Sequence, residues 1–373
     1  MRTGCLLPFA VICVGLVIPA EADGQIRLRD FVITEGASLE GYLGNFAAIT
    51  VPQIDSTERA VAGVGEVSVR GILRLMGREN QTLDMAFDGG IRQFATGGFQ
   101  LRNYAPREHS GSVETMYQRL IRGGTLTADA GARFRSIADR PPLPLYLAPG
   151  YDRYTSGVSY RYRDFLDVGV EGEIADYAAP KVLPALDLLD RSSLVVNAGV
   201  RKIYRSPAEL DRNDSWGLRL FSSYSYHSYP QQGQGSTRID HALGAGAAFQ
   251  GRWERLSLEF TLEGTRSRST SLRVEYNAAR LSGRADWILG EKTQVGLYGT
   301  LARKRFIQPG QDALVPGEEA DNASMLYADL TRHLGERVSG AFQFGWQKVE
   351  TNISGAYYTR FGGSFFLRVR PWN

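Results

Sequence analysis

Apolar and polar residues alternate one by one along much of this chain, most regularly in RLSLEFTLEGT at residues 255–265. The apolar set there is Leu256, Leu258, Phe260 and Leu262, and the polar set is Ser257, Glu259, Thr261 and Glu263. Successive side chains of a β-strand point to opposite faces, so this spacing predicts a strand with one apolar and one polar face. Such a strand separates either a core from water or lipid from the lumen of a membrane barrel.

The same alternation recurs from near the beginning of the chain to its end. It covers residues 67–75, 83–92, 126–135, 158–163, 342–347 and 360–370. No segment of comparable length carries an apolar stripe with the helical period, although 183–189 can form one helical turn within a loop. The chain is therefore predicted to be all-β.

Short and long connections alternate between the predicted strands. The short set is 76–81, 122–124, 163–166, 206–214, 251–254, 289–292 and 334–336. The long set, richer in Pro, Gly and charge, is 52–59, 95–110, 138–150, 178–191, 229–236, 266–270, 308–320 and 350–354. Short turns at one rim and long loops at the other are typical of a transmembrane antiparallel up-and-down β-barrel. The loops imply about 16 strands, or 14 if one hairpin is misread, with the first beginning near Thr34 and the last ending near Val369.

A soluble β-sandwich is the alternative fold, because it also explains the alternation. It does not explain the alternating connection lengths or aromatic residues near strand ends. We expect Trp216, Tyr224, Tyr226 and Tyr229 to lie toward one end of their strand, as a membrane-interface girdle does. Trp253, Trp287 and Trp346 are likewise expected at a rim or facing lipid. These features favour the barrel.

The N-terminus has the pattern of a secretory signal peptide over residues 1–22. Arg2 is followed by an apolar run from Leu6 to Ile18, and Ala20-Glu21-Ala22 forms a small-x-small cleavage site. The run is shorter than the roughly 20 residues that a membrane helix needs. We expect cleavage there, a short periplasmic segment at 23–33 and a barrel over 34–370.

The rest of the composition excludes several classes of function. Both cysteines, Cys5 and Cys13, lie within the predicted signal peptide, so thiolate metal sites and cysteine nucleophiles are excluded from the exported chain. The net charge of +3 gives no case for nucleic-acid binding. No phosphate-loop, dinucleotide or zinc-protease motif follows the signal peptide, and no cofactor is expected.

The signal peptide, the alternation and the closing stretch YYTRFGGSFFLRVRPWN at 357–373 resemble the outer-membrane β-barrel proteins of Gram-negative bacteria as a class. The resemblance covers roughly residues 34–370 and rests on pattern rather than on a diagnostic motif. It implies export through the periplasm, insertion into the outer membrane by the barrel assembly machinery, and contact with outer-membrane lipid.

If the apolar face meets lipid, the charged residues of the other face line the lumen. The predicted pore-lining residues are Arg161, Arg163, Glu171, Glu173, Glu259, Glu263, Arg273, Glu275, Arg284, Asp286, Arg360 and Arg368. A hairpin folded about Arg268 would place Glu263 opposite Arg273. Arg161 and Arg163 are expected to approach Glu171 and Glu173 in the same way. The wall is either a selective constriction or a pairing network that keeps it neutral and stiff.

Three further features are candidate sites. Glu318, Glu319 and Asp321 in the loop LVPGEEADNAS can hold Ca²⁺, although such carboxylates more often belong to a solvated loop. The apolar loop RPPLPLYLAPGYDRY at 140–154 can fold into the mouth, grip a partner, or pack against neighbouring loops. His227, near Ser225 and Ser228, suggests a barrel hydrolase only by composition, and no enzyme activity is expected.

The sequence therefore predicts a porin-like channel that passes small hydrophilic solutes through a lumen of mixed charge. The alternative is a non-conducting surface barrel whose extracellular loops bind a partner or an envelope component.

Overall fold

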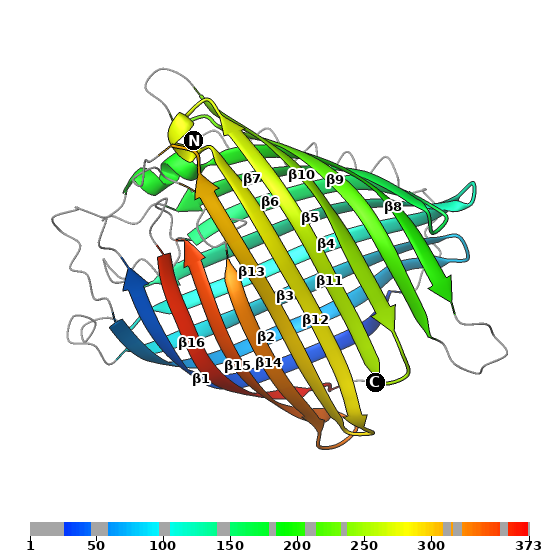
Figure 1. Cartoon of the computed structure of the whole chain (residues 1–373). Coiled ribbons are helices and arrows are strands. Elements are labelled where there is room, and N and C mark those ends of the chain that lie inside the picture. Colours follow the sequence, from blue (N-terminus) through cyan, green and yellow to red (C-terminus); the bar gives the residue numbers. More distant parts are fainter. Residues whose placement is uncertain are drawn as a thin grey trace.

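The computed structural model describes residues 26–45, 59–96, 105–139, 150–178, 184–205, 214–232, 237–308, 315, 323–350 and 357–371. Within them the chain forms a closed barrel of sixteen antiparallel strands (Figure 1). The strands are β1 (Arg27–Asn45), β2 (Arg59–Arg78), β3 (Gln81–Thr96), β4 (Arg107–Ile121), β5 (Gly124–Ala138), β6 (Gly150–Tyr162), β7 (Leu166–Ala178), β8 (Arg191–Arg205), β9 (Ser215–Tyr229), β10 (Arg238–Arg252), β11 (Leu256–Ser269), β12 (Tyr276–Gly290), β13 (Thr293–Phe306), β14 (Ser324–His333), β15 (Val338–Glu350) and β16 (Tyr357–Val369). No helix of the described residues is long and apolar enough to cross a membrane.

Each strand pairs with the next along the chain, and β1 pairs with β16 to close the barrel. This confirms the predicted up-and-down topology with 16 strands, and the last strand ends at Val369 as predicted. The first strand begins at Arg27, earlier than the predicted Thr34. Its additional residues pair with β2, from Arg27 opposite Arg74 to Ile33 opposite Val69.

The connections define two different ends of the barrel. Tight turns at 79–80, 122–123, 163–165, 253–255, 291–292 and 334–337 lie at one end, which we call the turn end. Gly123, Arg122 and Arg163 have positive φ there, the conformation that such turns require. The longer connections lie at the opposite end, the loop end. These include the short 3₁₀ helices η2 (Pro184–Leu189) and η4 (Leu272–Val274).

The outer surface of the barrel is apolar. Leu39, Leu262, Leu301 and Phe344 are each more than half exposed, and they belong to the outward-facing rows of their strands. Closing the sheet pairs the backbone groups of every strand on both sides, which lipid requires. An apolar exterior on a closed barrel is the arrangement typical of a transmembrane barrel, and the leucines of RLSLEFTLEGT belong to this outer face.

Aromatic residues mark two levels on the outside of β8–β10. Near the turn end, Trp216 stacks on Tyr204 with ring centroids 4.1 Å apart. Near the loop end, Tyr224 and Tyr226 pack against His241. Trp216 and Tyr224 are roughly 26 Å apart along β9, which for a strand tilted by about 40° covers about 20 Å of a lipid-facing band about 25 Å tall. The prediction that Trp216 and the tyrosines share one end of their strand was wrong, because they lie at opposite ends.

Candidate functional site

The inner wall is the candidate site, because it collects the charged residues that alternate with the lipid-facing ones. Nine of the twelve residues predicted to line a pore lie in inward-facing rows. They are Arg161, Glu171, Glu173, Glu259, Glu263, Arg284, Asp286, Arg360 and Arg368. The other three lie outside the strands. Arg163 is in a tight turn, Arg273 is in η4, and Glu275 follows η4.

The strand register places neither predicted pair directly opposite, although Arg161 and Glu171 line one cavity. Glu263 lies opposite Arg280 rather than Arg273, because the connection between β11 and β12 is centred on residues 270–275 and not on Arg268. On the β6–β7 hairpin, Arg161 lies opposite Asp167, and Glu173 lies opposite Thr155. Glu275 instead accepts hydrogen bonds from the Arg268 guanidinium (3.3 Å) and the Ser269 backbone N–H (3.2 Å).

Charges near the loop end form ion pairs that are partly or fully buried, and we call these pairs the loop-end belt. Arg92 is its clearest member, because its guanidinium lies 2.7 Å from Glu40, 3.3 Å from Glu66 and 3.9 Å from Glu108. Arg135 also binds Glu108, at 3.2 Å. The carboxylate of Glu40 further accepts a hydrogen bond from the Tyr42 hydroxyl. These contacts link β1 to β5 across the inner face.

The loop-end belt continues around the barrel. Glu173 binds Arg153 at 3.4 Å and Arg191 at 2.9 Å. Lys304 and Glu350 meet at 3.1 Å, bridging β13 and β15 beyond the end of the short strand β14. Their side chains are only 3% and 0% exposed. The belt gives the loop end of the wall fixed, largely neutral pairs.

Sequence reasoning did not find most of the loop-end belt. Glu40, Glu108, Arg191, Lys304 and Glu350 were not among the predicted pore-lining residues. The alternation would have assigned Glu40 and Glu108 to the polar face if their strands had been traced to the loop end. The pairing of Arg92 with Glu40 joins strands that are not adjacent, and no sequence pattern signals it.

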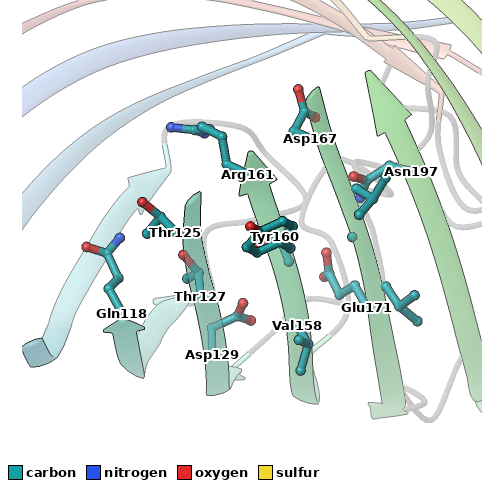
Figure 2. Close-up of a pocket in the computed structure, with 15 residues that line it drawn as sticks. Gln118, Thr125, Thr127, Asp129, Val158, Tyr160, Arg161, Asp167, Glu171 and Asn197 are labelled. Carbon is teal, nitrogen blue, oxygen red and sulfur yellow. The ribbon is translucent and has the colours of Figure 1, made fainter. Parts of the chain in front are cut away.

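The middle of the wall is different, because it holds carboxylates without ion pairs. Asp129 on β5 and Glu171 on β7 line a cavity of about 320 Å³ with Thr127, Arg161 and Asn197. Figure 2 shows both carboxylates turned toward the strand between them, β6. Gly157 leaves the space there, since a Cβ atom at that position would lie 2.9 Å from the carboxylate oxygens of Asp129. Within the described residues neither carboxylate forms an ion pair, and Glu171 is exposed to the lumen while Asp129 is half-buried.

Near the turn end, paired and unpaired charges occur together. Arg74 binds Asp84 at 2.5 Å, and Arg284 binds Asp286 at 2.6 Å. Arg219 donates to Asp167 through Nε at 3.0 Å and through Nη2. Arg201 and Arg252 line a second cavity, of about 500 Å³, and make no ion pair with any described residue.

The described residues give little support to the other predicted sites. Glu318, Glu319, Asp321 and the apolar stretch 140–149 lie outside them. Among the residues described, no three His, Cys, Asp or Glu side chains are placed to hold a metal ion. His227 Nδ1 lies 2.7 Å from Ser193 Oγ on the neighbouring strand. The facing carboxylate, Asp240, is bound by Arg238 and Ser269.

No protein-family model matches this sequence. A search of curated proteins finds no relative. Among solved structures, the barrel is similar to Pseudomonas aeruginosa OccK2 (OpdF), solved in complex with glucuronate, at 9% identity over 92% of this chain and 98% of that one, with a TM-score of 0.45. It is similar to an anion-selective porin from Comamonas acidovorans at 9% identity over 93% and 100%, with a TM-score of 0.43. A bacterial polysaccharide outer membrane secretin matches at 12% identity over 90% and 98%, with a TM-score of 0.42. Identities and TM-scores this low say nothing about what this chain conducts or binds.

Proposed function

We propose that this chain is a porin-like outer-membrane channel that passes small hydrophilic solutes through a lumen of mixed charge. The observation that carries the proposal is the unpaired charge on the inner wall of a barrel whose outer wall is apolar. Asp129, Glu171 and Glu259 form no ion pair with described residues, and an ionised carboxylate away from water is too costly to retain. A water-filled lumen beside them would let all three carboxylates stay ionised.

The dimensions of the barrel support the same proposal. A barrel of about eight strands is filled by its own side chains, whereas 16-stranded porins leave an aqueous channel. This barrel has sixteen strands. The nine inward-facing residues predicted to line a pore would set its charge selectivity, with the loop-end belt as the stiffer part of the wall. Export by the signal peptide and insertion by the barrel assembly machinery belong to the same proposal.

The second candidate function is a non-conducting surface barrel. The loop-end belt supports it, because its partly buried ion pairs connect adjacent strands, and in one case β1 with β3, at the mouth. A barrel closed there would present its loops without passing solute.

Planar-bilayer recording separates the two candidates. Protein refolded from urea, and shown to fold by heat-modifiable gel migration, is expected to give discrete current steps in KCl. If correctly folded protein gives no current above the leak of the bare bilayer, the channel function is excluded and the surface barrel is favoured.

Charge neutralisation tests whether these residues line the path. The combined variant Asp129→Asn, Glu171→Gln, Glu259→Gln should shift the reversal potential in a KCl gradient toward anion selectivity. Glu291→Gln, in a turn-end connection outside the lumen, is the matched control and should leave it unchanged. Equal reversal potentials in all three proteins would exclude these carboxylates from the path.

A further inference from the structure

We infer that the turn end of the lumen carries a binding subsite for a small dicarboxylate, built around Arg201 and Arg252. The inference deepens the proposed channel function, on which it rests, by naming a class of solute. It is carried by the placement of the two arginines, by the absence of a carboxylate ion-paired to either of them among the described residues, and by the cavity that they share.

The subsite lies on the inner face of β8–β11. Arg201 on β8 is directly opposite Arg219 on β9, and Arg252 on β10 is opposite Ser215 and Ser257. All three arginines line the cavity of about 500 Å³. Two of the inward positions between them, Gly217 and Ala248, are small, and Gln250 lies beside them. Small residues here leave room for a solute between long guanidinium side chains.

Arg201 and Arg252 do not serve to neutralise carboxylates of the inner wall. Two arginines directly opposite one another on a sheet repel each other, and Asp167 offsets only Arg219. Arg201 and Arg252 have no ion-pair partner among the described residues. Arginines of the loop-end belt, such as Arg92 and Arg191, each bind a carboxylate. The turn end therefore keeps two cationic groups available to a solute.

The number and spacing of the free guanidiniums favour a dicarboxylate. Ala248 is directly opposite Arg219, at the level of Arg201, and Arg252 lies about 13 Å further along β10. A guanidinium binds a carboxylate through two parallel hydrogen bonds. One carboxylate for each free arginine requires two carboxylates joined by a short chain. Ser215, Ser257 and Gln250 supply neutral polar groups along the cavity, and Glu259 at its edge disfavours a compact, multiply charged anion.

Isothermal titration calorimetry of the detergent-solubilised full-length protein tests the subsite directly, with sodium glutarate as the probe. Glutarate is expected to bind more tightly than butyrate, which has one carboxylate, and more tightly than inorganic phosphate. Arg201→Gln and Arg252→Gln should each weaken binding by about tenfold or more, because each loses charge-assisted hydrogen bonds. Arg133→Gln removes an inward-facing charge elsewhere and should leave the affinity unchanged.

Three outcomes would overturn the subsite: affinities that neither variant changes, an equal loss in Arg133→Gln, or phosphate binding as tightly as glutarate. Each variant is first checked by heat-modifiable migration, and Arg201→Lys, which retains the charge, should keep part of the affinity. Bilayer recording separates this result from the channel proposal. Glutarate binding without current would support the subsite and contradict the channel function. Current without glutarate binding would support the channel function and contradict the subsite.

Discussion

At the scale of single residues, burial distinguishes ion pairs that have similar distances. Lys304 and Glu350 are 3.1 Å apart and almost completely buried. Arg284 and Asp286 are 2.6 Å apart, but the arginine side chain is 59% exposed. Lys304 also lies over the rings of Tyr276 and Phe306, at 4.2 Å and 4.9 Å from their centroids. Removing one partner of a buried pair leaves an uncompensated charge, whereas an exposed partner is solvated instead.

Lys304→Met is therefore expected to lower the free energy of unfolding by about 3–5 kcal/mol, because Glu350 would remain buried without its partner. Arg284→Met, the matched exposed pair, should cost about 0–1 kcal/mol. Urea titration of the refolded barrel, followed by tryptophan fluorescence, measures both. The double variant Lys304→Met, Glu350→Met should recover much of the lost stability. If Lys304→Met alone costs as little as Arg284→Met, burial does not make the Lys304–Glu350 pair more important than an exposed pair.

Asp190 provides a pH-dependent prediction outside the strands. Burial, reinforced by the charges of Asp176 and Asp187, raises the pKa of Asp190, although the Tyr177 backbone N–H bound at 2.8 Å opposes the shift. A raised pKa means that the folded state binds this proton more tightly than the unfolded state does. Stability from this group should therefore rise as the pH falls through its folded pKa toward the ordinary value of about 3.9.

Asp190→Asn should accordingly unfold at the same temperature as the natural protein or higher at pH 7, with the difference shrinking in acid. Asparagine can still accept from Tyr177, and the Gln231 amide can turn its oxygen toward the new amide group. Asp190→Ala loses both contacts and should unfold at a lower temperature. Thermal unfolding followed by circular dichroism between pH 4 and pH 8 measures all three proteins, and a stability advantage of Asp190→Asn that grows in acid would contradict the assignment.

At the scale of strands, the sequence predicts faces better than it predicts register. The period-two alternation correctly assigned Leu258 and Phe260 to the outer face, because any strand with this spacing separates them from Glu259. It could not locate the turn within the serine- and arginine-rich stretch 266–273. There the chain continues into η4, and buried Val274 and Glu275 close the connection. A strand register depends on such loop packing, which the alternation does not contain.

Glycines of the outer face provide a test of strand packing. Phe87 on β3 lies over Gly71 on β2, where a Cβ atom would be 2.5 Å from the phenyl ring and 3.2 Å from the Asp30 carbonyl oxygen. Gly71→Ala should therefore displace the ring and lower both the folding yield and the thermal midpoint. Gly65→Ala lies on the same face of β2 with no atom within 4 Å and should fold like the natural protein. Heat-modifiable migration and circular dichroism compare them, and equal yields would show that Phe87 moves at no cost.

At the scale of the whole molecule, three levels of charge follow the barrel axis. The loop-end belt is paired and largely shielded from solvent, the middle holds the carboxylates Asp129 and Glu171, and the turn end holds the guanidiniums of Arg201 and Arg252, none of these four ion-paired to a described residue. The sequence indicated a mixed-charge wall but not this order, because the order depends on how far each strand is staggered against the next. A solute crossing the barrel would meet the three levels in sequence.

The position of the bilayer on the barrel gives the last prediction. Trp287 is opposite Leu256 near the turn end, and Trp216 lies in the turn-end aromatic stack. Phe260 lies about 13 Å further along β11 than Leu256, close to the middle of a lipid-facing band about 25 Å tall. Variants with a single tryptophan at 216, at 287, or at 260 through Phe260→Trp should therefore report different depths.

Reconstitution into phosphatidylcholine brominated at shallow or deep positions of the acyl chains measures those depths through fluorescence quenching. The tryptophans at 216 and 287 should be quenched most by shallow bromines, because an indole prefers the interface where its N–H can reach polar groups. The tryptophan of Phe260→Trp should be quenched most by deep bromines. Weak quenching of all three by both lipids would place the apolar row of RLSLEFTLEGT against something other than lipid, and the glutamates that alternate with it would no longer belong to a lumen.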